Sequence, residues 1–200
     1  MKMNNHMLRD NPITRSTAHQ SPIVLSLEGC IAVGKSSLLS ALRTSTLAHK
    51  YALFVVEEPV GRWQDVNGVN LLELYYKHPE RYAFAFQLNC LQTRFEALDH
   101  VLARQSSDDR RVLLILERSW FSDLECFATL HHRCGNISPV ELSLLHQHFT
   151  RGVVDKPDIN GIIMLHVPTD VSMHKIRSRG RAGETKVDHQ YQQQLMEVYD

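Results

Sequence analysis

The sequence predicts a single α/β domain built around a parallel β-sheet. Short apolar runs of the kind that form buried strands alternate with segments whose apolar residues recur every three or four positions. This alternation is typical of an α/β domain with a parallel sheet. The first apolar run leads directly into the loop sequence G-x-x-x-x-G-K-S at residues 29–36, and a helical pattern follows the loop. Three of the apolar runs end in glutamate, which would gather carboxylates at one edge of the sheet.

Four apolar runs are assigned as strands. Residues 23–28 form a continuous apolar strand of the kind that sits inside a parallel sheet. Residues 52–58 form the second strand, and Pro59 ends its pairing. Residues 112–117 are the most apolar run and are expected near the centre of the sheet, and residues 159–167 form the fourth strand.

The helical segments follow from periodicity and from capping residues. The longest is expected to begin near Pro79, because proline suits the first turn of a helix, and to end at Arg104. Pro168-Thr169-Asp170 is expected to cap the helix that ends near Arg177. The other expected helices cover residues 37–48, 71–77, 120–133, 139–151 and 187–200, and residues 61–70 are expected to be a loop.

Composition excludes several classes of protein. The 200 residues suit one domain, and the formal net charge of zero gives no basic excess for a nucleic-acid partner. No apolar run approaches the ~20 residues of a membrane span, so no membrane partner is expected. The four cysteines form no C-x-x-C pair, which argues against a zinc site or a disulfide framework and favours a reducing compartment, the cytoplasm.

Residues 1–21 are polar and lack the hydrophobic core of a signal peptide. The segment carries Lys2, Arg9 and Arg15 against the single acid Asp10, which is part of the composition of a mitochondrial leader. We expect a disordered or leader-like tail here, followed by one domain over residues 22–200. A mitochondrial location is the alternative to the cytoplasm.

The loop at residues 29–36 is a phosphate-binding sequence in the right context, between an apolar strand and a helix. Gly29 and Gly34 let the backbone fold tightly so that its N–H groups point at an oxyanion. Lys35 can reach the terminal phosphates, and the Ser36 hydroxyl can bind magnesium. The alternative is a glycine turn that happens to precede Lys-Ser. The expected phosphate contacts are Gly29, Cys30, Ile31, Ala32, Val33, Gly34, Lys35, Ser36 and Ser37.

Carboxylates stand at the carboxyl ends of three predicted strands: Glu28, then Glu57 and Glu58, then Glu117. Ligands of parallel sheets bind beyond these ends. Such a gathering indicates a site more than a solvated surface.

Further motifs follow the loop in order. They are EPVGRW at residues 58–63, PERYAFAFQ at 79–87, ERS at 117–119 and an arginine-rich turn at 177–181. From about residue 23 to its end the chain resembles the deoxynucleoside kinase family, and most of all its deoxycytidine and deoxyguanosine kinase branch. The resemblance implies a P-loop kinase fold with three α/β/α layers and a homodimer. It also implies transfer of the γ-phosphoryl group of ATP or another nucleoside triphosphate to the 5′-hydroxyl of a deoxyribonucleoside, in nucleotide salvage.

The resemblance also assigns the chemistry to residues. Glu58 matches the general base for the 5′-hydroxyl, and the proline after it sets the register on Glu58 instead of its neighbour. Glu117 matches a magnesium ligand beside Ser36. Arg118 matches a contact to the 5′ end and the transferred phosphate, and Lys35 completes the catalytic set. A structural salt bridge at a strand end is the alternative for Glu117 and Arg118.

Other matches concern the base of the substrate. Gln87 matches the amide that bonds the base edge. Arg94 and Asp123 match a charged pair that the thymidine-accepting branch lacks, which favours deoxycytidine or a purine deoxynucleoside. Cys90 matches a pocket position whose size can tune base choice. A plain helix–helix salt bridge is the alternative for Arg94 and Asp123.

The remaining matches concern the sugar, the pocket walls and a lid. Tyr76 and Glu184 match the pair that holds the 3′-hydroxyl. Arg179 and Arg181 match the arginines of a mobile lid over the phosphates. Lys175 stands where the family more often has arginine, so Arg177 is an alternative cation. Trp63, Leu72 and Phe86 match pocket walls, with plain core packing as the alternative.

Family members continue with a further strand and a loop that packs on the adenine of the donor. This sequence stops inside a helical pattern, so we expect a C-terminally truncated domain without that strand. Two alternatives stay open, a thymidine kinase of the same fold and a nucleotide-binding isoform without turnover.

Overall fold

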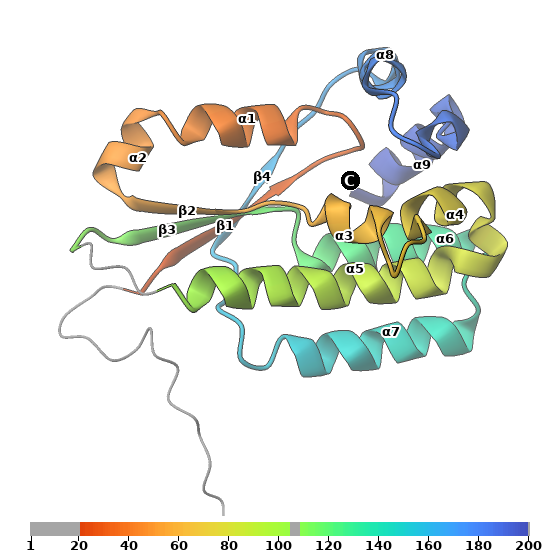
Figure 1. Cartoon of the computed structure of the whole chain (residues 1–200), viewed down its shortest axis with the longest axis horizontal. Helices are drawn as coiled ribbons and strands as arrows, with labels where there is room; N and C mark the ends of the chain where they lie inside the picture. The colour runs from red at the N-terminus through yellow and green to blue at the C-terminus, as the bar shows by residue number, and fades with distance from the viewer. Residues whose placement is uncertain (1–20, 105–108, 200) are drawn as a thin grey trace, which may run out of the picture.

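The computed structural model describes residues 21–104 and 109–199. Its centre is a parallel sheet with strand order β2-β3-β1-β4, and helices cover both faces, so the predicted α/β fold is confirmed (Figure 1). The tail expected over residues 1–21 lies, except for Ser21, outside the described residues. The strands are β1 (Ile23–Glu28), β2 (Ala52–Val56), β3 (Val112–Glu117) and β4 (Gly161–Met164).

β3 lies between β2 and β1, which confirms its predicted central position. Leu114 and Leu116 face the main core beneath the sheet, and Leu113 and Ile115 face the opposite side. A strand buried on both faces needs apolar residues at every position. This explains why residues 112–117 form the most apolar run of the chain.

Two strands are shorter than expected. The pairing of β2 with β3 ends at Val56, so Glu57 and Glu58 project beyond the sheet before Pro59. β4 begins only at Gly161 because Asn160 closes the ladder: its side-chain oxygen accepts from the Val24 N–H at 2.7 Å. The end of β2 matters for function, because Glu57 and Glu58 lie at the carboxyl edge of the sheet, where ligands bind.

In Figure 1, α1 and α2 cover one face of the sheet, and α5 and α7 lie on the other. The helix expected over residues 37–48 is in fact two, because Ser45 caps a new helix by accepting from the Leu47 N–H. The α-helices outside the 120–133 segment are α1 (Lys35–Leu42), α2 (Thr46–Lys50), α3 (Val60–Gln64), α4 (Leu71–Lys77), α5 (Pro79–Leu102), α7 (Pro139–Gly152), α8 (Thr169–Arg179) and α9 (His189–Tyr199).

The prediction of a loop over residues 61–70 is wrong in its first part, where α3 forms. Gly61 suggested a turn, but Trp63 stabilises a helical turn by inserting into the core, where it is 5% exposed. Its indole N–H donates to the Thr93 hydroxyl of α5 at 2.9 Å. Tertiary packing here overrides local propensity.

The helix expected over residues 120–133 is wider at its start than an α-helix. Residues Ser122–Ala128 form a π-helix, η2, and α6 (Thr129–Arg133) continues it. π-turns are rare and frequently mark functional sites. This one carries the Asp123 side chain into the interior, where it is 3% exposed.

The chain closes over the carboxyl end of the sheet. Thr169 and Asp170 make no side-chain cap at the start of α8, so that expectation is wrong, and the N-cap residue is Pro168. The helix ends at Gly180 with φ +61°, and the short helix η3 (Glu184–Lys186) leads into α9. No helix in the described part of the chain is long and apolar enough to span a membrane.

Candidate active site

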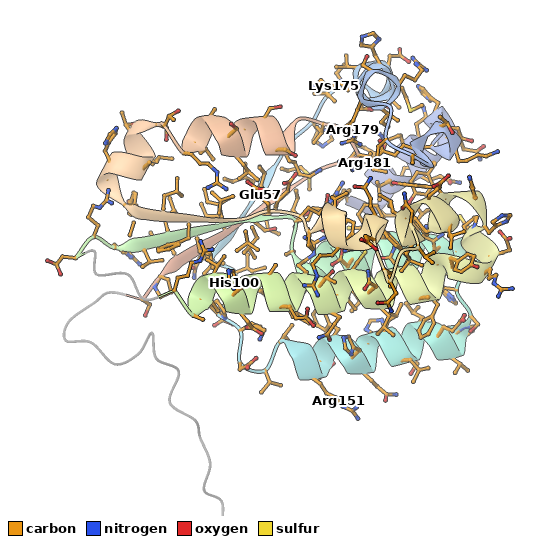
Figure 2. All side chains as sticks on the ribbon, in the orientation of Figure 1. Glu57, His100, Arg151, Lys175, Arg179 and Arg181 are labelled. Atoms are coloured by element: carbon orange, nitrogen blue, oxygen red, sulfur yellow. The ribbon has the colours of Figure 1, made fainter. Side chains whose placement is uncertain are left out.

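A cavity of about 550 Å³ opens beyond the carboxyl ends of β1, β2 and β3. Figure 2 shows Lys175, Arg179 and Arg181 over this edge of the sheet, and all three line the cavity. Of the residues expected in the site, Glu28, Gly29, Cys30 and Arg94 are missing from the cavity wall. The expected residues in the wall are Ile31, Ala32, Val33, Gly34, Lys35, Ser36, Ser37, Glu58, Trp63, Leu72, Tyr76, Phe86, Gln87, Cys90, Glu117, Arg118, Asp123, Arg179, Arg181 and Glu184.

The loop between β1 and α1 needs glycine at both of its ends. Gly29 has φ +132°, and a Cβ atom there would lie 2.5 Å from the Leu165 carbonyl oxygen. Gly34, with φ +118°, stands at the N-cap of α1. The loop therefore curls back onto the first turn of a helix, a geometry that presents backbone N–H groups to an anion.

Lys35 lies along this loop. Its Nζ donates to the carbonyl oxygens of Gly29 at 3.1 Å and of Cys30 at 3.0 Å. Burial lowers its pKa, and Arg118 lowers it further, to about 7, although Glu58, Glu117 and Glu28 oppose the shift. A polyphosphate would supply the negative charge that favours protonated Lys35.

Glu58 is the ionised centre of the cavity. Its Oε1 accepts from Arg118 Nη1 at 2.8 Å and from Arg94 Nη2 at 3.4 Å. Burial alone would raise its pKa, but Arg118, Arg94 and Lys35 outweigh burial and hold the pKa at about 2. Glu57, by contrast, has a side chain that is 65% exposed and pairs with Arg43.

Ser36 and Glu117 lie together at the phosphate end of the cavity. The Ser36 hydroxyl donates to Glu117 Oε1 at 2.7 Å. Within residues 21–104 and 109–199, no group of three or more His, Cys, Asp or Glu side chains could hold a metal ion. One hydroxyl and one carboxylate suit Mg²⁺, which keeps water and phosphate oxygens as its other ligands.

At its other end the cavity is apolar, with one buried amide. Gln87 is 1% exposed, and its Nε2 is buried with no hydrogen-bond partner among the described residues. The Phe86 ring packs edge-on against Trp63 at 5.5 Å and stacks on Tyr75 at 4.2 Å. An apolar slot with an unpaired amide fits a flat, polar-edged ring.

Arg94 and Asp123 form a buried ion pair between α5 and η2. Arg94 Nε donates to Asp123 Oδ2 at 2.6 Å, and Nη2 donates to Oδ1 at 3.0 Å. Arg94 Nη1 donates to the carbonyl oxygen of Glu117. Asp123 therefore faces the cavity while Arg94 lies behind it, so the pair links two helices and one of its members reaches the wall.

Glu184 joins the lid region to the cavity. Its side chain is 2% exposed and accepts from Arg179 at 2.6 and 3.0 Å and from Arg181 at 3.2 Å. Lys175 Nζ donates to the Val33 carbonyl oxygen of the phosphate loop at 3.3 Å. Lys175 and not Arg177 thus lines the cavity.

Several wall residues were not expected from the sequence: Leu39, Val60, Tyr75 and Phe127. Tyr75 is the largest, and its hydroxyl lies 2.5 Å from His131 Nε2. Because Tyr75 and Tyr76 are adjacent and identical, the sequence did not indicate that both rings would line the cavity. Glu28, which was expected among the site carboxylates, does not line the cavity: Ser119 and Ser122 enclose it beneath the floor.

Comparison with known proteins agrees with this geometry. A family profile described as deoxynucleoside kinase matches residues 25–200. A probable deoxycytidine kinase of Fowlpox virus is 32% identical over 169 residues, which cover 84% of this chain and 66% of the relative. The deoxycytidine kinase of Homo sapiens is 29% identical, over 86% of this chain and 71% of the relative. A thymidine kinase of Ictalurid herpesvirus 1 is 31% identical, over 96% and 79%.

Proposed function

The chain belongs to the deoxynucleoside kinase family, and we propose that it transfers the γ-phosphoryl group of a nucleoside triphosphate to the 5′-hydroxyl of a deoxyribonucleoside. The observation that carries the proposal is the ionised Glu58 carboxylate, held by Arg118 and Arg94 in the cavity that the phosphate loop also lines. The family and its kinase-named relatives support phosphorylation, and binding without turnover is not favoured.

The low pKa of Glu58 fits this chemistry. Phosphoryl transfer passes through a loose transition state, in which the attacking hydroxyl keeps its proton until late. A carboxylate with a pKa of about 2 is a weak base, but it can orient the hydroxyl by accepting its hydrogen bond. Arg118, already bonded to Glu58, lies where it can meet the negative charge of the transferred group.

The donor is proposed to be ATP or another nucleoside triphosphate with Mg²⁺. The loop N–H groups and Lys35 would bind its phosphates, with Arg179 and Arg181 closing over them. Ser36 and Glu117 would hold the metal, which would offset the negative charge of the donor phosphates. The arginines are partly exposed, at 33% and 26%, and we propose that they exchange their ion pairs with Glu184 for contacts to phosphate.

The acceptor is proposed to be deoxycytidine or a purine deoxynucleoside. The slot between Phe86 and its neighbours would take the base, and Gln87 would bond its edge. Asp123 lies at the wall and pairs with Arg94 behind it. The resemblance to the deoxycytidine and deoxyguanosine kinase branch implies that this pair favours these acceptors over thymidine. Tyr76 and Glu184 line the same cavity and would hold the 3′-hydroxyl.

Assembly and location complete the proposal. The apolar stripe of α5 packs on the sheet and on α7 of its own chain. The exposed apolar side chains Phe121, Val140 and Leu144 instead lie on and beside α7, and this surface would form the homodimer contact. Size-exclusion chromatography with light scattering of Val140→Lys checks this, with a monomer as the expected result. The cytoplasm is the proposed location.

A product assay tests the proposed function. The chain is incubated with Mg-ATP and deoxycytidine, deoxyguanosine, deoxyadenosine or thymidine in parallel, and 5′-monophosphates are separated by chromatography. Product from deoxycytidine or a purine is expected. A 5′-deoxy analogue, which lacks the attacking hydroxyl, should bind without consuming ATP. Product from thymidine alone would contradict the proposed acceptor, and no product from any of the four would contradict the proposed function.

A further inference from the structure

The catalytic Arg118 has an unusual backbone conformation. Its φ is +58°, a left-handed value that it shares, among non-glycine residues of the described chain, with Ala32 and Asn67. Side chains disfavour this region, so surrounding contacts must hold the residue there. The Arg118 N–H donates to the Leu27 carbonyl oxygen at 3.0 Å. The next N–H, that of Ser119, donates to Glu28 Oε1 at 2.9 Å.

Glu28 gathers donors from both sides of this turn. Its Oε1 also accepts from the hydroxyls of Ser26 at 2.5 Å and Ser119 at 2.9 Å. Its Oε2 accepts from the Ser122 hydroxyl and, at 3.4 Å, from the Tyr199 hydroxyl. The residue is 4% exposed and does not line the cavity, so it has no access to a substrate.

The Glu28 carboxylate is ionised despite its burial. Burial raises its pKa, but the Ser122 and Ser26 hydroxyls, the Arg118 charge and the Ser119 N–H together lower the pKa below its usual value. Hydrogen bonds to an ionised acceptor are stronger than those between neutral groups. The turn at residues 118–122 is therefore fastened at its backbone and at two hydroxyls to one buried charge.

The Arg118 side chain depends on the direction that this turn gives it. Its guanidinium donates to Glu58 at 2.8 Å, to the Gly29 carbonyl oxygen at 2.9 Å and, through Nε, to the Tyr199 hydroxyl at 3.2 Å. Tyr199 thus touches both Arg118 and Glu28. A backbone change at Arg118 would move all three bonds, since they begin from one planar group.

We propose that Glu28 is a positioning residue for phosphoryl transfer: its carboxylate holds the turn at residues 118–122 in the conformation that aims the Arg118 guanidinium at Glu58. The inference rests on the proposed kinase function. It assigns Glu28 no contact with the reacting atoms. Its effect on the rate is expected to pass mainly through Arg118, because its charge makes only the smallest of the three carboxylate contributions to the pKa of Lys35.

Glu28→Gln tests the proposal, because the amide keeps the shape and loses the charge and half of the acceptor capacity. The expected result is a fall in kcat of about 10- to 100-fold, the size of effect that a misplacement of about 1 Å produces, with little change in the KM of either substrate. Leu145→Ala on α7 is the matched control. Leu145 is fully buried outside the cavity, so this variant should lose stability without the fall in kcat at a temperature where both variants are folded.

A double-mutant cycle separates positioning from general support. In the Arg118→Lys background, Glu28→Gln should lower kcat less than 3-fold further, because the group on which it acts is already gone. An equal loss in both backgrounds, or an unchanged kcat in Glu28→Gln alone, would overturn the proposal. If Glu28→Gln does not fold, Ser119→Ala/Ser122→Ala takes its place, with a smaller kcat loss expected in the same direction.

A measurement without turnover keeps the two proposals apart. In ¹⁵N-labelled protein, the Arg118 Nε–H signal, assigned by its loss in Arg118→Lys, should exchange with solvent at least about 10-fold faster in Glu28→Gln than in wild type. Unchanged exchange would overturn the positioning role even if the chain is an active kinase. Faster exchange in Glu28→Gln, combined with a wild-type chain that makes no product, would support the positioning of Arg118 by Glu28 and overturn the proposed kinase function.

Discussion

At the scale of residues, the cavity is a set of opposed charges in which each group sets the protonation state of its neighbours. Arg118 lowers the pKa of Lys35, whereas Glu58 and Glu117 raise it. Its pKa of about 7 leaves the ammonium poised between its charged and neutral forms near neutrality. Binding of an anion beside Lys35 is therefore coupled to the uptake of a proton by its amine.

We expect Lys35 to take up a proton when Mg-ATP binds, and the number of protons taken up should increase as the pH rises. With a pKa of about 7 in the free protein, Lys35 would gain about half a proton at pH 7, about nine-tenths at pH 8 and almost none at pH 6 when phosphate restores its charge. Isothermal titration calorimetry in buffers of different ionisation enthalpy measures this uptake. Lys35→Arg should abolish the pH dependence, because arginine is always protonated. Equal uptake at pH 6 and pH 8 in wild type would contradict it.

Residue identity was predictable where a motif fixes a spacing. Gly34, Lys35 and Glu58 line the cavity where short sequence patterns placed them, and their roles stay predictions. The position of Glu28 was not predictable, because the end of a strand suits both a carboxylate that faces a ligand and a carboxylate that is buried under a turn. Only the fold shows that Ser119 and Ser122 reach it.

At the scale of elements, the π-helix η2 brings Asp123 to the cavity wall, where it pairs with Arg94 of α5. Asp123→Asn keeps the shape of the side chain and removes the charge that pairs with Arg94. We expect kcat/KM for deoxycytidine or a purine to fall roughly 10- to 100-fold, the loss of one charged hydrogen bond. The kcat/KM of Asp123→Asn for thymidine is measured in the same way for comparison. A parallel loss for all nucleosides would mean that the pair supports only the fold.

The contact between α5 and α7 permits a stability test. A Cβ atom at Gly152 would lie 2.2 Å from the Phe95 ring, so Gly152→Ala should cost about 1–3 kcal/mol of unfolding free energy by overpacking. Gly61→Ala in α3 is the matched control, because a Cβ there meets nothing within 4 Å. It should be neutral or stabilise by up to about 1 kcal/mol. Denaturant unfolding monitored by circular dichroism decides between them, and equal effects would contradict the packing.

Elements were predictable where periodicity is long and local. The span of α5 was right to within two residues at its end, because the helix carries a sustained apolar stripe. The short helix α3 was missed, since it depends on the burial of Trp63 in a core that no local pattern shows. The π-helical turn of η2 likewise depends on the pair of Arg94 and Asp123, which are distant in sequence, and not on local helix propensity.

At the scale of the whole molecule, His131 joins three helices in the interior. Its ring meets Tyr75 of α4 at 2.5 Å and Tyr191 of α9 at 3.5 Å. Burial lowers its pKa from 6.5 to about 4. Between pH 6.5 and pH 4 the His131 imidazole is protonated in the unfolded chain and neutral in the folded chain. The free energy of unfolding therefore falls as the pH drops from about 6.5 to about 4.

The lowered pKa of His131 should reduce the free energy of unfolding by about 3 kcal/mol at pH 4, in addition to any loss that protonation of Glu58 causes below pH 4.5. Chemical denaturation from pH 7 to pH 4 measures the slope. His131→Gln should flatten it between pH 6.5 and pH 4, and His132→Gln on the same helix should keep it. A slope that survives in His131→Gln would assign the effect to other groups.

The rate of 5′-monophosphate formation by Glu58→Gln, measured against wild type with saturating Mg-ATP and the preferred deoxynucleoside, tests the central claim most directly. The carboxamide fits the same space but is uncharged, so it loses the ion pairs with Arg118 and Arg94 and binds the hydroxyl more weakly. We therefore expect kcat to fall about 10²- to 10⁴-fold while Mg-ATP still binds. A Glu80→Gln variant, altered at an exposed carboxylate that does not line the cavity, should keep the wild-type rate. Wild-type turnover by Glu58→Gln would contradict the account, because the group that its geometry places at the centre of the cavity would then have no part in the transfer.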